Sequence, residues 1–431
     1  MERIIITGGR PLRGTVRVSG AKNSSLAIIA AACLAPDVSI LENVPHCQDV
    51  LTLTEILAGL GIGFEFSGSR LVVDARGVYN ISPPHDLCRR MRASFYAAGL
   101  LLARVGRAEV PLPGGCSIGT RPVDFHMRGF AALGAEVTIE HGYMKAIFPR
   151  RARGTQFYVP RSSVGTTINL MMAATTARGT TVLQNAAREP EVVDTAVFLN
   201  LMGAKVRGAG TDTITIRGVT ALHGAQYPII PDRIEAGTYL LCGVATRGDV
   251  LAHGLIPEHF QALLTKLTEA GAETLVEPDG VRVRAAGDLR AVDVDTAPYP
   301  GFATDLHPPL AALLTRAQGT STIRETIYDS RFGYVEELRR LGAEMRVDGD
   351  TVHITGVEQL TGAPVEARDI RAGAAVVIAG LAATGVTEIT NLENIDRGYE
   401  GLVEKLRGLG GQVERGSIEP AALPEVVPEV V

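Results

Sequence analysis

One short phrase occurs six times along the chain: a leucine or similar apolar residue, a glycine, and then a strand-like run. The glycines of this phrase are Gly61, Gly134, Gly203, Gly271, Gly342 and Gly410, which lie 68 to 73 positions apart. A helix that ends at a glycine and continues into a β-strand explains the phrase. The 431 residues therefore form six similar units, and the fold has to be built from these copies.

A second landmark has the same spacing. An apolar helical stretch ends at each of the following residues, mostly before a run rich in Thr, Val and Ile: Pro36, Gly106, Gly179, Gly248, Gly319 and Gly385. Each unit thus holds two helices, each followed by a strand, which is a βαβ type of unit. Three units have the size of a domain, so six units predict two α/β domains.

The first helix of each unit is apolar on all sides. Examples are 26–35, 170–177 and 374–383, which consist almost entirely of small and apolar residues. A helix without a polar face is buried. We therefore expect each domain to enclose three such helices inside a wall of sheets.

Composition excludes several classes of protein. The net charge of −5 gives no basic excess for nucleic acid. The longest apolar runs, such as 372–383, are shorter than the roughly 20 residues that span a bilayer, and the N-terminus lacks a signal-peptide layout. The five cysteines are odd in number and widely spaced, so we expect reduced thiols and a cytoplasmic protein. No CxxC or HExxH motif is present in the sequence, so we expect no zinc site.

Charged residues recur at one position of the repeat. The positions 14 residues before the second landmark are Lys22, Arg92, Gly165, Ile234, Asp305 and Arg371. Each lies at the predicted start of an apolar helix, where unpaired N–H groups and the helix dipole favour anions. One interpretation is a pocket for phosphate or carboxylate groups; the other is ordinary solvation of helix ends.

A glycine-rich loop at 113–124 contains Cys116 outside any predicted helix or strand. Arg121 follows in the same segment and would lower the pKa of this thiol if the loop folds back. A loop cysteine without a role is the alternative. His126 comes next, and we interpret it as a packing residue.

Five stretches together resemble the UDP-N-acetylglucosamine 1-carboxyvinyltransferases, a family of enolpyruvyl transferases that opens bacterial peptidoglycan synthesis. They are 19–24, 113–124, 185–191, 231–238 and 396–400, and the resemblance runs from residue 1 to about 414. The family implies two inside-out α/β domains, each of three repeats with buried helices, and an active site in the cleft between them. The resemblance implies domains at 1–21 plus 231–431 and at 22–230, and we expect the tail after about Glu414 to be disordered.

The implied reaction transfers the enolpyruvyl group of phosphoenolpyruvate to the 3-hydroxyl of UDP-N-acetylglucosamine and releases phosphate. By this resemblance Cys116 donates a proton to C3 and Asp305 acts as base toward the sugar hydroxyl. Lys22, Arg121 and Arg397 hold phosphoenolpyruvate. Asn23 lies beside them, and Arg331 and Arg371 add positive charge. No metal or redox cofactor and no macromolecular partner is implied.

The same resemblance assigns twelve residues to the UDP-sugar. They are Arg92, Arg121, Pro122, Val123, Asp124, Phe125, Arg161, Ser162, Ser163, Val164, Asp305 and Ile327. The sequence departs from the family at three of the positions compared, with Arg161 in place of Lys, Ala303 in place of Pro and His307 in place of Gln. Cys116 implies inactivation by fosfomycin, which alkylates this thiol.

Three alternatives stay open. In the first alternative the acceptor is shikimate 3-phosphate, but the family that uses it lacks the Cys116 loop. In the second alternative the acceptor is another nucleotide of specialised metabolism. In the third the chain is a non-catalytic relative that binds a UDP-sugar; the joint presence of Cys116, Asp305, Lys22 and Arg397 argues against it.

Overall fold

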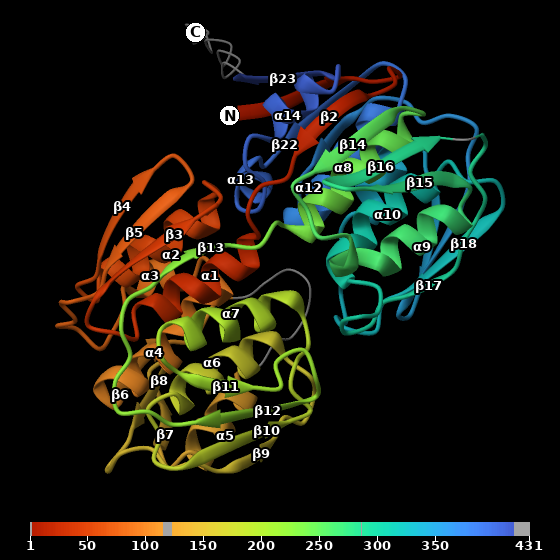
Figure 1. The fold of residues 1–431 in the computed structure, drawn as a ribbon. Helices are drawn as coiled ribbons and strands as arrows, with labels where there is room; N and C mark the ends of the chain where they lie inside the picture. Colours follow the sequence, from red (N-terminus) through yellow and green to blue (C-terminus); the bar gives the residue numbers. More distant parts are fainter. Residues whose placement is uncertain (1, 115–122, 286, 418–431) are drawn as a thin grey trace, which may run out of the picture.

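Two bodies of similar architecture make up the computed structural model, which describes residues 2–114, 123–285 and 287–417 (Figure 1). Within these ranges the buried apolar side chains form two separate cores. One core draws on residues 4–18 and 234–413, and the other on residues 21–229. These cores support the division into domains 1–21 plus 231–431 and 22–230, which we propose.

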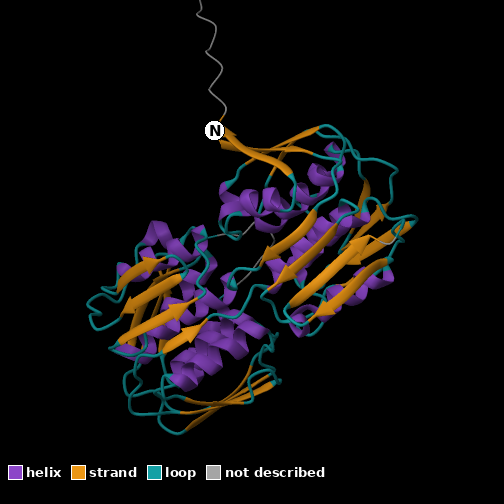
Figure 2. Ribbon diagram, turned by 45° about the horizontal axis from the view of Figure 1, so that its top comes forward, coloured by secondary structure: helices purple, strands orange, loops and turns teal. Residues whose placement is uncertain are grey.

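Apolar helices fill both cores, as the repeat predicts. In the described part of the chain the inner helices are α1 (Lys22–Ala32), α4 (Tyr96–Val105), α6 (Val164–Ala174), α8 (Arg233–Ala245), α10 (His307–Leu314) and α12 (Ile370–Ala382). In α12 every residue except Ile370 is buried. Figure 2 shows strands enclosing the helices of each domain. Even the longest, α8 and α12, have 13 residues, and no helix among the described residues is long and apolar enough to cross a membrane.

Three sheets enclose the described helices of the domain 22–230. Their strand orders are β13-β3-β5-β4, β6-β8-β7 and β11-β12-β10-β9. The bounds are β3 (Val38–Glu42), β4 (Gly63–Ser67), β5 (Arg70–Asp74), β6 (Arg107–Pro111), β7 (Glu136–Glu140), β8 (Tyr143–Ile147), β9 (Gln156–Tyr158), β10 (Thr180–Gln184), β11 (Lys205–Arg207), β12 (Thr213–Arg217) and β13 (Gln226–Pro228).

Three further sheets enclose the described helices of the other domain. Their orders are β21-β22-β1-β23, β15-β16-β14-β2 and β17-β18-β20-β19. The bounds are β1 (Glu2–Thr7), β2 (Arg13–Arg17), β14 (Asp249–His253), β15 (Ala272–Glu277), β16 (Gly280–Ala285), β17 (Val294–Asp295), β18 (Thr320–Arg324), β19 (Glu344–Asp348), β20 (Thr351–Thr355), β21 (Pro364–Glu366), β22 (Val386–Thr390) and β23 (Gln412–Ser417).

The repeated unit is larger than the sequence pattern suggests. Strands β9 and β10 pair in parallel around α6, which confirms the βαβ unit. After its outer helix, however, a unit continues into an antiparallel hairpin such as β11–β12 rather than a single strand. The second strand of each hairpin lies centrally in its sheet, so it adds hydrogen bonds that complete the wall.

Outer helices and short turns complete the units. The outer helices are α2 (Gln48–Ala58), α5 (Asp124–Ala132), α7 (Pro190–Leu201), α9 (Gln261–Glu269), α11 (Val335–Arg340) and α14 (Leu402–Gly408). The short helices are α3 (His85–Cys88), α13 (Glu393–Asp396), η1 (Arg92–Phe95), η2 (Pro257–Phe260) and η3 (Thr304–Leu306).

The six repeat glycines all end an outer helix in the left-handed region. Their φ angles lie between 86° and 104°, and a strand follows each of them. A side chain in this region clashes with its own backbone, which is why glycine recurs there. The prediction of a C-terminal glycine before a strand is confirmed at every copy.

Two crossing segments connect the domains. Ala21 donates its N–H to the carbonyl of Ile230 at 2.7 Å, and Asp232 donates to Ser19 at 2.9 Å. The carboxylate of Asp232 caps α8 and also accepts the N–H of Lys22 at 3.0 Å, so it fixes the starts of helices in both domains. At Gly20 a Cβ atom would lie 1.7 Å from the carbonyl oxygen of Asn43, so only glycine fits this crossing.

The carboxy-terminal strand extends beyond the expected limit. Strand β23 pairs with β1 from Gln412 to Ser417, opposite Thr7 to Glu2. The expectation that disorder begins after Glu414 is therefore wrong for residues 415–417, because the amino-terminal strand supplies backbone partners for them. Residues 418–431 lie outside the described residues. The pairing explains why the first and the last described strands belong to one domain (Figure 1).

Substituting a repeat glycine tests the role of its backbone. Gly134 has φ +96°, and a Cβ atom added there would meet no other atom within 4 Å, so Gly134→Ala adds only backbone strain, of about 1–2 kcal/mol. We expect the thermal midpoint to fall by about 2–4 °C per kcal/mol, measured by calorimetry.

Gly408→Ala is the matched control. Gly408 also has open space around it but lies within α14 with ordinary helical φ, where alanine is the better helix former. Its midpoint should stay unchanged or rise. Equal losses in both variants would contradict this account of the repeat.

Candidate active site between the domains

The charged positions of the repeat lie at helix starts, as predicted. Lys22 is the first residue of α1, Arg92 the first of η1, and Arg371 the second of α12. Asp305 lies in η3, the turn that leads into α10. The remaining two positions, Gly165 and Ile234, are the second residues of α6 and α8. The repeat register therefore located helix starts in both domains.

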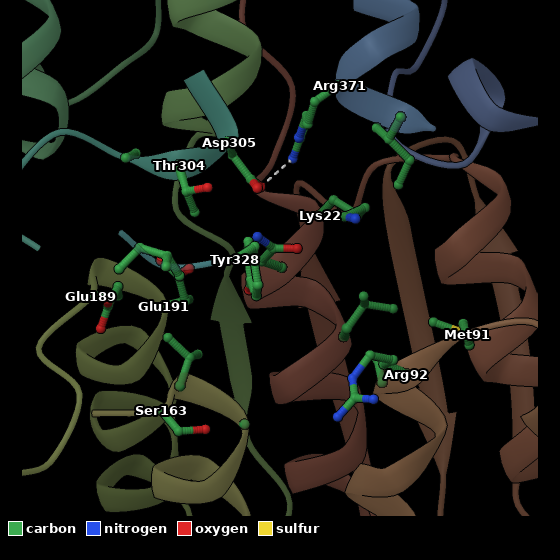
Figure 3. Close-up of a pocket in the computed structure, with 18 of the residues that line it drawn as sticks. Lys22, Met91, Arg92, Ser163, Glu189, Glu191, Thr304, Asp305, Tyr328 and Arg371 are labelled. Atoms are coloured by element: carbon green, nitrogen blue, oxygen red, sulfur yellow. Dashed lines mark hydrogen bonds and ion pairs between the residues drawn. The ribbon is translucent and has the colours of Figure 1, made fainter. Parts of the chain in front are cut away.

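These helix starts converge on one cavity of about 630 Å³, lined by residues from both domains. Most residues that the family resemblance implicates line it. They are Lys22, Asn23, Arg92, Phe125, Arg161, Ser162, Ser163, Val164, Asp305, Ile327, Arg331, Arg371 and Arg397. Figure 3 shows Lys22, Asp305 and Arg371 close together, with Arg92 and Ser163 on the opposite side.

Of the other five implicated residues, three lie outside the described residues and two are described but do not line the cavity. Cys116, Arg121 and Pro122 are outside the described residues. Val123 and Asp124 are described, at the start of α5, but neither lines the cavity. One carboxylate oxygen of Asp124, Oδ1, is buried without a hydrogen-bond partner among the described residues.

Asp305 is held between two buried guanidinium groups. Arg331 donates an N–H to Oδ1 at 2.7 Å, and Arg371 donates to Oδ2 at 2.9 Å. Burial acts to raise the pKa of Asp305, but the charges of Arg371, Arg331 and Lys22 outweigh it and hold that pKa well below its usual value. The side chain remains 26% exposed. The cavity thus presents an ionised carboxylate to whatever binds there.

Asp49 is a second carboxylate at the cavity, and sequence reasoning missed it. Its Oδ1 accepts a hydrogen bond from Arg397 Nε at 2.8 Å, and its Oδ2 lies 3.3 Å from Lys22 Nζ. The two cations come from different domains. No repeat position marks Asp49, which lies on an outer helix.

Arg161 also connects the domains. One terminal nitrogen donates to the carbonyls of Thr326 and Ile327, at 3.0 and 2.6 Å. The residue that departs from the family's Lys thus contacts the turn that carries Ile327 through its guanidinium.

The departure at His307 belongs to a buried network beneath Asp305. His307 Nδ1 lies 2.9 Å from Glu325, and its Nε2 lies 2.7 Å from the hydroxyl of Tyr334. Thr304 donates to the same carboxylate at 2.8 Å and accepts from Arg331 at 3.0 Å. Burial acts to raise the pKa of Glu325, but its hydrogen bonds lower it to about 2. The ionised Glu325 therefore supports the arginine that binds Asp305. At Ala303 the carbonyl accepts the N–H of Leu306 and closes the turn.

Two acidic residues, Glu189 and Glu191, also line the cavity (Figure 3). They lie at the start of α7, and Arg233 lies 3.7 Å from Glu191. Burial raises the pKa of Glu191. Sequence reasoning did not predict either glutamate as a site residue. Both belong to the stretch 185–191 that carries the family resemblance, and this membership was the one signal in the sequence that could have identified them.

His126 is a buried packing residue that also lines the cavity, consistent with its interpretation. Asn169 donates to Phe95 and accepts from Gly99, which orients its amide so that Nδ2 donates to His126 Nδ1 at 3.0 Å. Burial and the charge of Arg92 lower the pKa of His126 to about 3. The ring is neutral at pH 7.

The four described cysteines are free, buried thiols. Burial raises the pKa to about 12 for each of Cys33, Cys47, Cys88 and Cys242. A thiol reacts as its thiolate, so these four are inert at neutral pH. Within the described ranges, no group of three or more His, Cys, Asp or Glu side chains is placed to hold a metal ion.

Comparison with known proteins gives the same family throughout. The family model for EPSP synthase (3-phosphoshikimate 1-carboxyvinyltransferase) matches residues 6–406. The chain is 51% identical to UDP-N-acetylglucosamine 1-carboxyvinyltransferase 3 of Caldanaerobacter subterraneus subsp. tengcongensis, over 96% of this chain and 99% of that protein. It is 53% identical to UDP-N-acetylglucosamine 1-carboxyvinyltransferase 2 of Symbiobacterium thermophilum, over 96% and 98%.

Solved structures share the architecture. The enolpyruvyl transferase NikO from Streptomyces tendae superposes with a TM-score of 0.87 at 26% identity, covering 97% of this chain and 99% of that one. EPSP synthase from Acinetobacter baumannii gives a TM-score of 0.77 at 18% identity, covering 97% and 100%, and so shows the fold alone. The expected pair of inside-out α/β domains is confirmed.

The buried histidine predicts a pH dependence of stability. In the unfolded chain His126 takes up a proton below about pH 6.5, but the folded protein resists protonation until about pH 3. Acid therefore favours the unfolded state in this window. We expect the wild type to lose about 1.4 kcal/mol per pH unit relative to His126→Gln between pH 6 and pH 4. Urea unfolding at several pH values measures the difference; a pH-independent difference would contradict it.

The buried thiols predict selective labelling. At pH 7.5 iodoacetamide should leave the four described cysteines unmodified in the folded protein, because their thiolate fraction is negligible. We expect a single label at Cys116, which Cys116→Ser removes. Intact-mass and peptide mass spectrometry count and locate the labels, and urea-unfolded protein serves as the fully labelled control. Label on any of the four in the folded protein would contradict their burial.

Proposed function

Since the chain belongs to the UDP-N-acetylglucosamine 1-carboxyvinyltransferases, within the EPSP synthase family, we propose that it transfers the enolpyruvyl group of phosphoenolpyruvate to the 3-hydroxyl of UDP-N-acetylglucosamine and releases phosphate. One observation carries this proposal. The ionised Asp305 faces a cavity between the domains that Lys22 and Arg397 also line. The site thus combines a carboxylate that can accept the proton of a hydroxyl group with cations that can bind an anionic donor.

The cations bind phosphoenolpyruvate. Lys22 and Arg397 hold its phosphate, with Asn23 beside them, and Arg121 joins them from the loop. Arg331 and Arg371 add positive charge for its carboxylate. Charge-assisted hydrogen bonds of this kind are strong in a cavity that excludes water, and they also stabilise the charge that develops during transfer.

Asp305 takes the proton of the sugar hydroxyl. In the free protein its pKa is held low by Arg371, Arg331 and Lys22, which makes the carboxylate a weak base. Bound phosphoenolpyruvate brings negative charge to the same cations and offsets them. The pKa of Asp305 therefore rises when both substrates are present, which strengthens the base at the moment of attack.

Cys116 supplies the second proton transfer. The hydroxyl oxygen bonds to C2 of phosphoenolpyruvate while C3 takes a proton from the thiol, which gives a tetrahedral intermediate. The Cys116 thiolate then takes a proton back from C3, the electrons of that C–H bond form the C2–C3 double bond of the enolpyruvyl product, and the C2–O bond to phosphate breaks so that phosphate leaves with the bonding electrons.

The UDP-sugar occupies the remainder of the cavity. Arg92, Phe125, Arg161, Ser162, Ser163, Val164 and Ile327 contact it from the lining. By the family resemblance Pro122, Val123 and Asp124 also contact it. The reaction is the first committed step of peptidoglycan synthesis. We place it in the cytoplasm, which the four free thiols support, because disulfides are rare there.

The proposal predicts phosphate release that requires both substrates. We expect release with UDP-N-acetylglucosamine and phosphoenolpyruvate, none with shikimate 3-phosphate as acceptor, and none after fosfomycin treatment. Asp305→Asn should lower kcat by about 10²- to 10⁴-fold, because the hydroxyl loses its base. A coupled phosphate assay measures both effects.

Asp295→Asn is the matched control. Asp295 also pairs with an arginine, Arg324, at 2.8 Å, but both side chains are more than half exposed and lie outside the cavity. Its kcat should stay within about twofold. Circular dichroism confirms that each variant is folded. No release with the UDP-sugar, or full activity in Asp305→Asn, would contradict the proposal.

A further inference from the structure

Two carboxylates in the cavity each hold two cations, but they differ in where the cations come from. Asp305 pairs with Arg331 and Arg371, which belong to the same domain as Asp305. Asp49 pairs with Lys22 of the domain 22–230 and with Arg397 of the other domain. The Asp49 cluster therefore exists only while the two domains lie in this arrangement.

The Asp49 cluster is well buried. The side chains of Asp49 and Lys22 are 7% and 9% exposed, and that of Arg397 is 30% exposed. The two oxygens of Asp49 divide the cations between them, Oδ1 to Arg397 and Oδ2 to Lys22. The backbone N–H of Asp49 also donates to the carbonyl of Arg397 at 3.3 Å. Side chain and backbone thus fix Arg397 together.

The backbone around Asp49 is itself held in place. Asp49 is the second residue of α2, where a carboxylate is favoured by the helix dipole. Three residues earlier in the chain, His46 donates its N–H to Glu400 of the other domain at 2.8 Å. The segment 46–49 therefore contacts 397–400 at two points, which leaves Asp49 little freedom.

We propose that Asp49 is a positioning residue that joins Lys22 and Arg397 across the domain boundary into one phosphate site. The inference rests on the proposed function and deepens it. Two neighbouring cations repel each other, and the carboxylate between them removes that repulsion while fixing their places. The donor phosphate then binds a pair assembled in advance, and only when the domains lie in this arrangement.

Charge and position make opposite predictions for Asp49→Asn. Removing the negative charge leaves the cavity more positive, so by charge alone phosphoenolpyruvate should bind more tightly. If Asp49 positions the cations, its loss frees Lys22 and Arg397, and phosphoenolpyruvate should bind more weakly. The sign of the change therefore separates the two roles.

Steady-state kinetics with both substrates varied provides the test. We expect Asp49→Asn to raise KM for phosphoenolpyruvate about tenfold while KM for UDP-N-acetylglucosamine stays within twofold. Asp49→Glu, which keeps the charge, should recover most of the loss. Asp37→Asn is the control, because Asp37 accepts backbone hydrogen bonds from Val38 and Gly224 away from the cavity.

A double-mutant cycle with Arg397→Gln tests the connection. If Asp49 acts through Arg397, the effect of Asp49→Asn on kcat/KM for phosphoenolpyruvate should fall below about threefold in the Arg397→Gln background. A lower KM in Asp49→Asn, equal increases for both substrates, or full additivity in the cycle would each overturn the inference.

The inference and the proposed function fail in different ways. If the wild type releases no phosphate from the two substrates, the proposed function fails. Calorimetric titration of phosphoenolpyruvate into wild type and Asp49→Asn then tests the inference without turnover. Tenfold weaker binding in the variant supports it, and equal or tighter binding overturns it.

Discussion

The apolar inner helices constrain where this protein can place charge. Each is mostly buried along its length, so charged side chains are tolerated mainly at the ends. The starts of these helices meet at the cavity between the domains, where N–H groups and helix dipoles favour anions. Lys22, Arg92 and Arg371 lie at such starts, and Asp305 lies in the turn before α10. The architecture therefore concentrates its charges at one site.

Opposite charges make that concentration stable. The four cations that pair with Asp305 and Asp49 would repel each other, and these two carboxylates reduce the repulsion. Asp305 does so within one domain and Asp49 between the two. The excess positive charge remains for an anionic donor. The same electrostatic balance lowers the pKa of Asp305 in the free protein and lets a bound anion raise it again.

Sequence reasoning predicted the features that recur in the repeat and missed the contacts that occur only once. Glycine spacing located the outer helix ends, and the repeat register located Lys22, Arg92, Asp305 and Arg371. Asp49 was not predicted because its partners lie 27 and 348 positions away, and no local pattern connects them. Glu325 was not predicted because, in the sequence, a buried carboxylate at the end of a strand cannot be told from a surface charge. The pairing of the carboxy-terminal strand with the amino-terminal one was missed because contact between the two chain ends has no local signal.

A crystal structure of Asp305→Asn with UDP-N-acetylglucosamine and phosphoenolpyruvate tests the central claim most directly, because the variant should bind both substrates without consuming them. The account predicts the donor phosphate between Lys22 and Arg397, and the sugar 3-hydroxyl about 3 Å from residue 305. Substrates bound outside this cavity, or a sugar with its 3-hydroxyl turned away from residue 305, would contradict it.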